Sequence, residues 1–431
     1  MNNWKNVKLG NILIESKVEA VDSNAEKRIR VLLGTRGVIK RPLTKETKGA
    51  TKYFKRKTGQ FIYGKQNLHK GAFGIVPNEL DGFSSSSDLP AFDIDNSCLP
   101  EWIYYFLRQG DYYISLIDIA KGAATKRIQP KALFEIEIPL PDIAIQRSII
   151  NYFISKEEKQ KELLIEIQSQ KQHLSNLKKS ILQEAIQGEL TADWRVQNPN
   201  TEPASELLKR IKAEKEQLIK NKKIKKEKAL PPITEEEIPF EIPSNWVWCR
   251  LGACSLNRDE LRKPISQKER ERRAKVYDYY GASGCIDKID NYTHDGSFLL
   301  IGEDGSNLKL RATPIAFEVK GQFWVNNHAH TIQFLDSITQ LYIQDHINGI
   351  DLKPYITGGF QPKLNQANLN KILIALPPLD EQKAIVEKVV HLMKKCAVLE
   401  GEIKTSEANA QMLMQAVLKE AFEGKKEEAH A

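Results

Sequence analysis

Two stretches of the chain carry the same helical pattern of apolar and polar positions. Within 138–188 and within 374–424, apolar residues recur at alternating steps of four and three. This spacing is the a/d seam of a left-handed coiled coil, and it predicts two helices of roughly 33 residues, or about 50 Å, each. The predicted seam positions are Ile149, Phe153, Lys156, Gln160, Leu163, Ile167, Gln170, Leu174, Leu177 and Ile181 in the first stretch, and Ile385, Val389, Leu392, Cys396, Leu399, Ile403, Ser406, Ala410, Leu413 and Val417 in the second.

The ends of both helices are marked by residues that stop or cap helical structure. The lead-ins PLPD and LPPLD place prolines before each helix, with Asp142 or Asp380 near its start. Proline ends the preceding strand, and an aspartate at a helix start accepts hydrogen bonds from free backbone N–H groups. Gly188 and Gly424 are expected to end the helices.

Neither helix is expected to be stable alone, because several seam positions of the first are polar. We therefore expect the two helices to pack against each other. An antiparallel arrangement is favoured because it relates the two copies by an approximate two-fold axis.

The chain is a duplication. Residues 138–188 align with 374–424 without a gap, at a constant offset of 236, with 14 identities in 51 positions. The alignment extends back to Gly122 on Gly358, and WKNVKLG at Trp4–Gly10 resembles WVWCRLG at Trp246–Gly252. A repeat this long indicates duplicated domains and not a solenoid. We expect a first domain over 1–137, the first helix over 138–190, a connector over 191–243, a second domain over 244–373, the second helix over 374–424 and a charged tail over 425–431.

The two divergent domains are basic and rich in short strand patterns, which favours mixed α/β folds. Glu26 to Lys70 holds 14 basic and two acidic residues, and Arg258 to Lys275 holds eight basic and four acidic. In the first domain the aromatic residues Tyr53, Phe54, Phe61 and Tyr63 lie between lysines. Such aromatics either stack on bases or pack in the core, and the run FIY favours a buried strand.

Charge and cysteine usage narrow the class of protein. The net charge is +8 at pH 7, which favours an acidic partner. The five cysteines are scattered, as expected in a reducing compartment. The segment MNNWKNVKLG does not resemble a signal peptide and no stretch predicts a membrane span, so we expect a cytoplasmic protein without membrane contact. The connector stretch Leu207 to Lys228, with ten basic and three acidic residues, is either a solvated helix followed by an extended linker or a phosphate-contacting segment.

Two apparent catalytic or metal-binding patterns have simpler interpretations. His328 and His330 alternate along a probable strand, as zinc ligands could, but a hydrogen-bonded structural pair is favoured because no third ligand is near in sequence. Asp142 and Glu157 imitate a nuclease motif, yet they fall on a helix lead-in and on a helix. We find no dinucleotide fingerprint, no nucleotide-binding P-loop and no adenine-methylase tetrapeptide. The sequence therefore predicts a binding protein without catalytic or metal-ligating residues.

The arrangement of these segments resembles the specificity (S) subunits of type I restriction-modification systems. The resemblance rests on the two alternating domains and helices, the lead-ins ending in Gln146–Arg147 and Gln382–Lys383, the re-entry EIPSNWVWCRLG, and GELTADWR after the first helix. FIYGKQNLHKGAFGIVPNEL, FLLIGEDGSNL and FWVNNHAHTIQF are similar to segments of their target-recognition domains.

The resemblance implies two α/β target-recognition domains, related by a pseudo-two-fold axis and separated by a long antiparallel two-helix coiled coil. Each domain would read one half of a split site in double-stranded DNA. Two methylase (M) subunits and motor-nuclease (R) subunits would be partners, with S-adenosylmethionine, ATP and magnesium on those partners and no cofactor in this chain. The alternatives are a specificity module of a modification-only or type IIB-like system, and a coiled-coil scaffold without sequence-specific DNA binding.

DNA-contacting residues are chosen by side-chain chemistry on the expected loops. The candidates are Lys52, Lys55, Arg56, Lys65, Gln66 and Arg127 in the first domain, and Asn307, Lys309, Arg311, Gln361 and Lys363 in the second.

Overall fold

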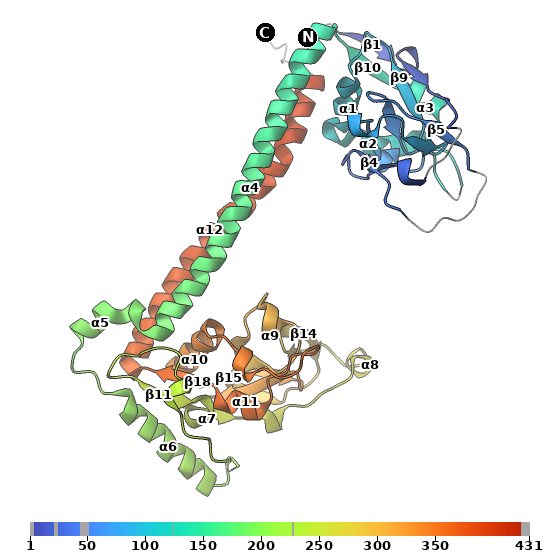
Figure 1. Ribbon diagram of the computed structural model, residues 1–431. Helices are drawn as coiled ribbons and strands as arrows, with labels where there is room; N and C mark the ends of the chain where they lie inside the picture. The colour runs from blue at the N-terminus through green and yellow to red at the C-terminus, as the bar shows by residue number, and fades with distance from the viewer. Residues whose placement is uncertain (1–3, 21–24, 44–50, 124, 226–227, 424–431) are drawn as a thin grey trace, which may run out of the picture. The chain divides into compact units, whose positions relative to one another are not determined.

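The computed structural model describes residues 4–20, 25–43, 51–123, 125–225 and 228–423, and its chain divides into two compact units (Figure 1). One unit contains Met1–Gln170 with Glu402–Ala431, and the other contains Lys171–Gly401. Each unit therefore includes part of both long helices, α4 (Ile143–Gln187) and α12 (Leu379–Glu423). Among the described residues, no helix combines the length and apolar character needed to cross a membrane.

The first domain, residues 5–140, is a set of small antiparallel sheets covered by short helices. A four-stranded sheet has the order β2-β9-β6-β7, and β3 pairs with β4, β5 with β8 and β1 with β10. The strands are β1 (Lys5–Lys8), β2 (Leu13–Glu15), β3 (Ile29–Val31), β4 (Val38–Lys40), β5 (Tyr53–Lys55), β6 (Phe61–Tyr63), β7 (Phe73–Ile75), β8 (Ser84–Ser86), β9 (Ala91–Ile94) and β10 (Glu137–Leu140), and the helices are α1 (Pro100–Arg108), α2 (Tyr112–Ser115) and α3 (Pro130–Phe134).

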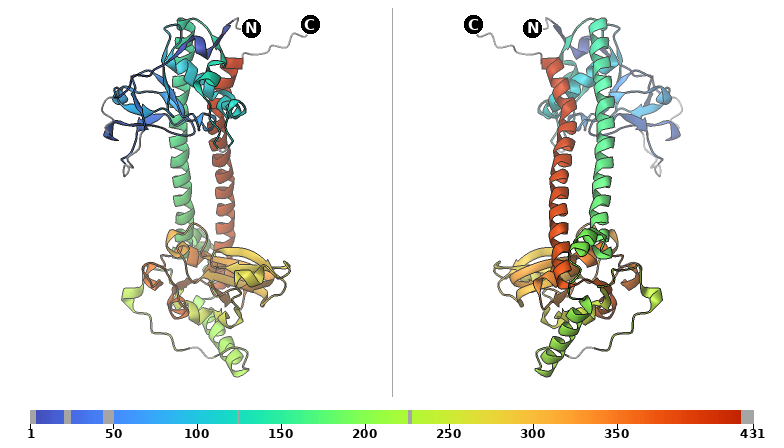
Figure 2. Two further views of the ribbon diagram at one scale, coloured as in Figure 1. Left: turned by 90° about the vertical axis from the view of Figure 1, so that its right-hand side faces the viewer. Right: turned by 90° about the vertical axis from the view of Figure 1, so that its left-hand side faces the viewer.

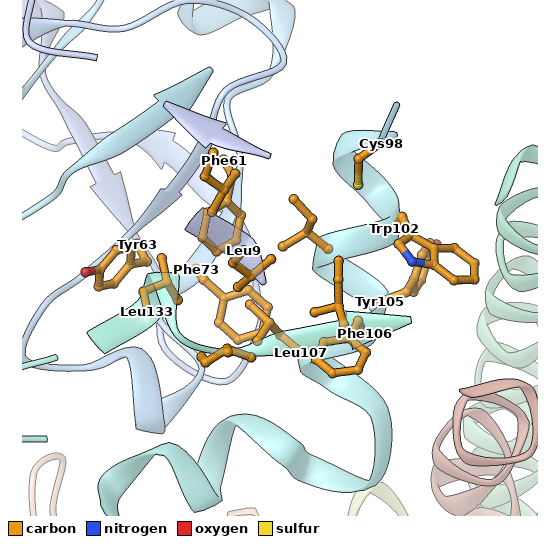
Figure 3. Packing of buried hydrophobic residues seen from close by; sticks show 14 of the residues in the cluster. Leu9, Phe61, Tyr63, Phe73, Cys98, Trp102, Tyr105, Phe106, Leu107 and Leu133 are labelled. Atoms are coloured by element: carbon orange, nitrogen blue, oxygen red, sulfur yellow. The ribbon is translucent and has the colours of Figure 1, made fainter. Parts of the chain in front are cut away.

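The core of the first domain lies between the four-stranded sheet and α1 (Figure 3). The side chains of Phe61 and Tyr63 are fully buried there, which confirms that FIY is a core strand. Trp102 projects from the other side of α1 toward the long helices, and its ring lies 4.8 Å from that of Phe422 near the end of α12. Phe153 of α4 also packs against Phe422, at 5.8 Å between ring centroids. The domain core therefore continues into both long helices.

The second domain, residues 247–376, is built on one mixed six-stranded sheet of order β12-β17-β15-β16-β13-β14, in which the β13–β16 pair is parallel. Its strands are β11 (Val247–Arg250), β12 (Leu256–Asn257), β13 (Tyr277–Gly281), β14 (Gly284–Ile289), β15 (His294–Gly302), β16 (Ala316–Val325), β17 (Ala329–Gln333) and β18 (Leu373–Leu376), and its helices are α7 (Leu251–Cys254), α8 (Gln267–Arg270), α9 (Asn307–Leu310), α10 (Ser337–Gly349) and α11 (Gln366–Lys371). The sheets of the two domains differ, as their divergent sequences require.

The borders of the domains are nevertheless built alike. The opening strand of each copy pairs antiparallel with the strand that leads into the long helix, Val7 opposite Ile138 in β1–β10 and Cys249 opposite Ile374 in β11–β18. The duplicated motifs at the two ends of each copy thus meet in one small sheet. This pairing closes each domain and directs the chain into its long helix.

The long helices run antiparallel and side by side (Figure 2). In one unit Gln160 of α4 donates a 2.6 Å hydrogen bond to the carbonyl oxygen of Ala410, and in the other Lys178 pairs with Glu400 at 2.7 Å. The predicted fold of two α/β domains with two antiparallel helices is confirmed. Each helix has 45 residues, which is longer than predicted because the first turns pack under the domains.

Eight of the 20 predicted seam positions are buried, and seven of these eight occupy the same position of the heptad. Buried seam residues are Phe153, Ile167, Leu174, Ile181, Ile385, Val389, Cys396 and Ala410. In contrast, the seam leucines Leu163, Leu177, Leu399 and Leu413 keep exposed fractions of 41, 46, 45 and 41%. The predicted pairing of the two helices along this seam therefore leaves part of the seam open to solvent. The two helices cover only part of each other's apolar face.

The helix-start prediction for Asp142 is confirmed, because its carboxylate accepts a 2.9 Å hydrogen bond from the backbone N–H of Ile145. Gly188 directly follows α4 with a φ of +82°, a left-handed conformation that glycine adopts without strain. The predicted helix end at Gly424 and the charged tail 425–431 lie outside the described residues, as do residues 44–50 of the basic stretch in the first domain.

A buried glutamine fastens α4 to the first domain. The Gln146 side chain is fully buried. Its carbonyl oxygen accepts a 2.8 Å hydrogen bond from the N–H of Leu99, just before α1, and its amide donates to the carbonyl oxygens of Ser97 at 2.9 Å and Pro141 at 2.7 Å. Three backbone groups of the domain border thus depend on one side chain.

Gln382 occupies the equivalent position in the second copy and is also fully buried. It accepts a 2.8 Å hydrogen bond from the hydroxyl of Thr339 in α10 and donates a 2.8 Å hydrogen bond to the carbonyl oxygen of Pro377. The glutamine shared by the two lead-ins is therefore a structural link between each long helix and its domain.

The start of α12 has an additional buried link that the start of α4 lacks. The fully buried carboxylate of Glu381 accepts hydrogen bonds from Thr191 at 2.7 Å, Arg195 at 2.5 Å and Trp246 at 2.8 Å. A buried carboxylate is tolerated only when its oxygens are satisfied in this way. The equivalent residue in the first copy is Ile145, which is 40% exposed. The segment GELTADWR therefore anchors the connector to the second domain's helix.

The basic connector stretch forms a helix, as predicted, but one that is packed on one side. Helix α6 (Ala204–Lys220) buries Leu207, Leu208 and Ile211. The Lys215 ammonium donates hydrogen bonds of 2.7 Å to the carbonyl oxygens of Gly252 and Ser255. Lys226 and Glu227 lie outside the described residues, and the phosphate-contacting role of this stretch stays a prediction.

We expect Gln146→Ala to lower the free energy of unfolding by about 1–3 kcal/mol, because three backbone groups lose their partner, the buried Gln146 side chain. Gln382→Ala is expected to act in the same direction. The matched control is Gln170→Ala, an exposed glutamine of α4, with an expected change within about 0.5 kcal/mol. Urea unfolding followed by tryptophan fluorescence measures the difference. Equal effects of Gln146→Ala and Gln170→Ala would contradict the structural role.

Candidate nucleic-acid interface

The two copies share an exposed hairpin just before the strand that enters the long helix. In the first hairpin, residues 121–127, Lys121 and Arg127 exchange backbone hydrogen bonds of 3.0 and 2.8 Å. In the second hairpin, residues 357–363, Thr357 and Lys363 do the same at 2.8 and 2.8 Å. The offset between the two is again 236, so the hairpin belongs to the duplicated part of the chain.

A glycine fixes the same turn in both hairpins. Gly122 and Gly358 have φ values of +131° and +85°. A Cβ atom added there would lie 2.3 Å from the carbonyl oxygen of Thr125 and 2.4 Å from that of Gln361. No other residue fits either contact, since both the space and the backbone angle exclude a side chain. In the second hairpin the residues that follow, 359–361, are therefore presented at the surface in a defined loop.

The first hairpin is positively charged. Lys121 and Lys126 are exposed, and Arg127 lies 3.4 Å from the carboxylate of Asp88. Burial, followed by the positive charges of Lys70 and Lys126, lowers the pKa of His69. The hairpin thus creates a local positive potential of the kind that attracts phosphates.

Three of the predicted contact residues come together at this hairpin. The N–H of Ile128, which follows Arg127, donates a 2.8 Å hydrogen bond to the carbonyl oxygen of Lys65, next to Gln66. Both Lys65 and Gln66 are partly exposed. Lys121 and Lys126 were missed by the sequence reasoning, although the match of Gly122 to Gly358 already pointed to a shared loop.

The second hairpin gathers the predicted residues of the second domain. Gln361 and Lys363 lie on it and are exposed, and Lys363 pairs with Glu303 at 3.2 Å. The ammonium of Lys309 in α9 donates a 3.1 Å hydrogen bond to the carbonyl oxygen of Gly359 in the loop. These three side chains form one exposed, polar and basic surface.

Asn307 and Arg311 have structural contacts beside that surface. The Asn307 side chain exchanges hydrogen bonds of 3.1 Å with the backbone of Thr313, and Arg311 donates a 3.0 Å hydrogen bond to the carbonyl oxygen of Asn348. Arg311 also has a φ of +51°, which is uncommon for a residue other than glycine. Both side chains shape the loop that follows α9.

Lys52, Lys55 and Arg56 lie on or beside β5, in a different sheet from the first hairpin. Lys52 and Lys55 are exposed, and Lys52 pairs with Glu19 at 3.1 Å. Their contact with DNA stays a prediction.

Arg56 requires a correction, because its side chain points into the domain and only 1% of its surface is exposed. Its guanidinium donates hydrogen bonds to the Ser85 hydroxyl at 2.7 Å and to the carbonyl oxygens of Ser16 at 2.9 Å and Leu89 at 3.1 Å. Burial lowers the pKa of Arg56 to about 10. Its role in this structure is to join three backbone segments. A basic residue in a basic stretch gave no sequence signal of this inward orientation.

A buried network of charged side chains packs against the base of the second hairpin. Arg262 pairs with Glu303 at 2.5 Å and with Asp259 at 3.1 Å. His330 contacts Asp259 at 2.6 Å and the carbonyl oxygen of Leu364 at 2.7 Å. Burial raises the pKa of Asp259, but the hydrogen bond with His330 and the charge of Arg262 outweigh it, so its pKa is lowered.

Both histidines of the NHAHT stretch make hydrogen bonds with carboxylates, since His328 contacts Asp304 at 2.9 Å. These are the hydrogen bonds that the structural interpretation of the pair predicts. Among the described residues, no group of three or more His, Cys, Asp or Glu side chains is placed to hold a metal ion. Glu157 of the apparent nuclease motif instead accepts hydrogen bonds from Tyr105 at 2.9 Å and Arg108 at 2.5 Å.

Comparison with known proteins places these features in context. Residues 259–406 match the model of the type I restriction modification DNA specificity domain. The chain is 28% identical over 255 residues to the type I restriction enzyme EcoEI specificity subunit and 34% identical over 258 residues to the EcoAI specificity subunit, both from Escherichia coli. These matches cover 54% and 53% of this chain, and the chain spans only 42% and 41% of the length of those relatives.

The fold is similar to that of a solved chain described in a study of complex assembly and conformational transition of the type I R-M system. The TM-score is 0.69 at 15% identity, and the match covers 98% of both chains. At this identity the similarity concerns the fold.

We expect Arg56→Met to lower the free energy of unfolding by about 1–3 kcal/mol, because two carbonyl oxygens and one hydroxyl lose their donor. The neighbouring exposed Lys55→Met is the matched control, with an expected change within about 0.5 kcal/mol. Thermal or urea unfolding of the two variants measures the difference. If both variants are as stable as the wild type, the guanidinium does not hold these segments together.

Proposed function

We propose that the chain is a specificity subunit of a type I restriction-modification system, which selects the DNA target of a methylase and nuclease complex without catalysing a reaction itself. Its target is a split, asymmetric site in double-stranded DNA, with one half read by each domain. The observation that carries the proposal is the duplication: two unlike domains are joined to equivalent helices through equivalent borders and hairpins. Such a module suits a site with two unlike halves.

In this proposal the hairpins make the two kinds of contact that recognition of a DNA sequence requires, contacts with phosphates and contacts with base edges. Lysine and arginine side chains, such as Lys121 and Lys126, position the duplex by contacting phosphates, which carries no sequence information. Amide and guanidinium groups can form paired hydrogen bonds with base edges in the major groove. Gln66 and Gln361 are the exposed or partly exposed amides at the two hairpins, and we assign them this reading role.

The long helices are proposed to set the spacer between the two half-sites. A helix of 45 residues extends about 67 Å at 1.5 Å per residue. Half-sites on one face of DNA are about 34 Å apart when they are separated by one helical turn. The helices are therefore long enough to span that separation, and the buried glutamines at both starts keep each domain fixed to its helix.

The exposed seam leucines are the proposed docking sites for two methylase subunits. Leu163 and Leu177 of α4 are equivalent to Leu399 and Leu413 of α12, and all four stay 41–46% exposed. Apolar residues left open at regular helical spacing indicate a surface that further helices cover. Because the leucines occur in equivalent pairs, the chain offers the same surface twice, which matches two copies of one partner.

Partner subunits carry the cofactors in this proposal. S-adenosylmethionine belongs to the methylase subunits, and ATP with magnesium belongs to motor-nuclease subunits. The complex acts in the cytoplasm, where DNA and these small molecules occur together. This chain contributes the selection of the site and the distance between its halves.

Exchange of residues 11–128 for the matching segment of a relative with another target tests the division of labour. We expect only one half of the methylated site to change, because the second domain and both helices are kept. Methylome sequencing of cells that carry the hybrid with its methylase identifies both halves. The reciprocal exchange of residues 253–364 is the matched control, and it should change only the other half. A hybrid that alters both halves at once would show that the domains do not read independently.

A further inference from the structure

The tip of the second hairpin carries a fully exposed aromatic side chain. The exposed fraction of Phe360 is 105%, and Leu310 at the end of the neighbouring helix α9 is 73% exposed. Phe360 is the most exposed of the large apolar residues that the structure describes. Transfer of a phenylalanine side chain from water to an apolar environment is favourable, so a partner that covers the Phe360 ring gains free energy.

The loop that carries Phe360 is braced by the protein. Besides the paired hydrogen bonds between Thr357 and Lys363, Lys309 donates to the carbonyl oxygen of Gly359 at 3.1 Å. The N–H of Gly305 donates to the carbonyl oxygen of Pro362 at 3.2 Å. The residues on both sides of Phe360 are thus held, and the tight turn at Gly358 presents the ring at the tip. A pre-formed loop loses little conformational entropy when it binds.

The groups around the ring favour an anionic partner. Positively charged and amide groups lie beside the apolar ring. Gln361 and Lys363 follow Phe360 in the chain, and Lys309 is hydrogen-bonded to the loop that carries it. An aromatic ring among cationic groups suits a polyanion that also has apolar surfaces. Duplex DNA has this combination, because stacked bases lie behind phosphates.

We propose that Phe360 is a wedge that inserts between adjacent base pairs in the half-site read by the second domain. This inference rests on the proposed function. An apolar side chain at this position unstacks one base step and bends the duplex, so the hairpin fixes the register of its half-site as well as contacting it. The equivalent residue of the first copy is Ala124. Its side chain is a single methyl group, too small to act as a wedge, so the wedge belongs to one half-site only.

Fluorescence of 2-aminopurine tests the wedge, because this base analogue brightens when it is unstacked. The analogue is placed in turn at each position of the second half-site other than the methylated adenine, in DNA bound by the complete chain with its methylase subunits. We expect one step to brighten with the wild type and to stay dark with Phe360→Ala. Affinity for the site should fall about 10- to 100-fold, as measured for lost aromatic–base stacking in other proteins.

Two further variants keep the result interpretable. Phe360→Trp preserves a flat apolar ring and should keep the fluorescent step. Ile286→Ala removes another exposed apolar residue of the second domain, 56% exposed, and should leave both fluorescence and affinity unchanged. Because Phe360 is fully exposed, Phe360→Ala should melt at the wild-type temperature.

Equal fluorescence of the wild type and Phe360→Ala at every position would overturn the wedge while leaving sequence-specific binding intact. Loss of the methylase subunits from Phe360→Ala would also overturn it, by assigning the ring to a protein contact. If the wild-type complex shows no preference for its site over random DNA, the proposed function itself fails. The three outcomes are distinguished in the same titration by fluorescence, by the mass of the complex and by competition with random DNA.

Discussion

Each long helix packs against one domain at its start and against the other domain at its end. The rest of the structure depends on this attachment at both ends. The aromatic cluster of Trp102, Phe153 and Phe422 joins the first domain to the start of α4 and the end of α12. A fully buried glutamine, Gln146 or Gln382, then locks each helix start to its own domain. Neither helix can move without disturbing a packed core. The role of spacer that we propose for the helices requires such a firm attachment of each helix start to its own domain.

The two duplicated halves share one set of structural features and differ in another. Shared features are the border sheets, the buried glutamines, the tight hairpins and the exposed leucines, and the first three have structural roles. The sheets and the residues at the hairpin tips differ, which fits the proposal that the two domains read unlike half-sites. One structural difference stands apart: Glu381 anchors the connector through Arg195, whereas Ile145 in the first copy is 40% exposed. The connector therefore belongs physically to the second half of the molecule.

The sequence predicted the helices, their antiparallel pairing and the two α/β domains, because periodicity and an internal repeat are strong local signals. Heptad spacing marks the apolar face of each helix but cannot show whether that face meets one helix or several, so the partial burial of the seam could not be predicted. The inward orientation of Arg56 was missed because the direction of a side chain depends on tertiary packing. The residues chosen in the second domain lie on or beside one hairpin, and their contact with DNA stays a prediction. The exposed Phe360 at the tip of that hairpin was not among them, because aromatic residues are assigned to cores by default.

Insertion of one heptad into each long helix, after Gln170 and after Ser406, tests the proposed spacer role of the helices most directly. It keeps the seam in phase and adds about 10 Å to each helix, or about three base pairs of DNA at 3.4 Å each. The measurement is the spacer length of methylated sites, read by methylome sequencing of cells carrying the folded, methylase-bound variant. We predict weaker methylation of the native site and a gain on sites whose spacer is about two to four base pairs longer. An unchanged spacer preference would show that something other than these helices measures the gap.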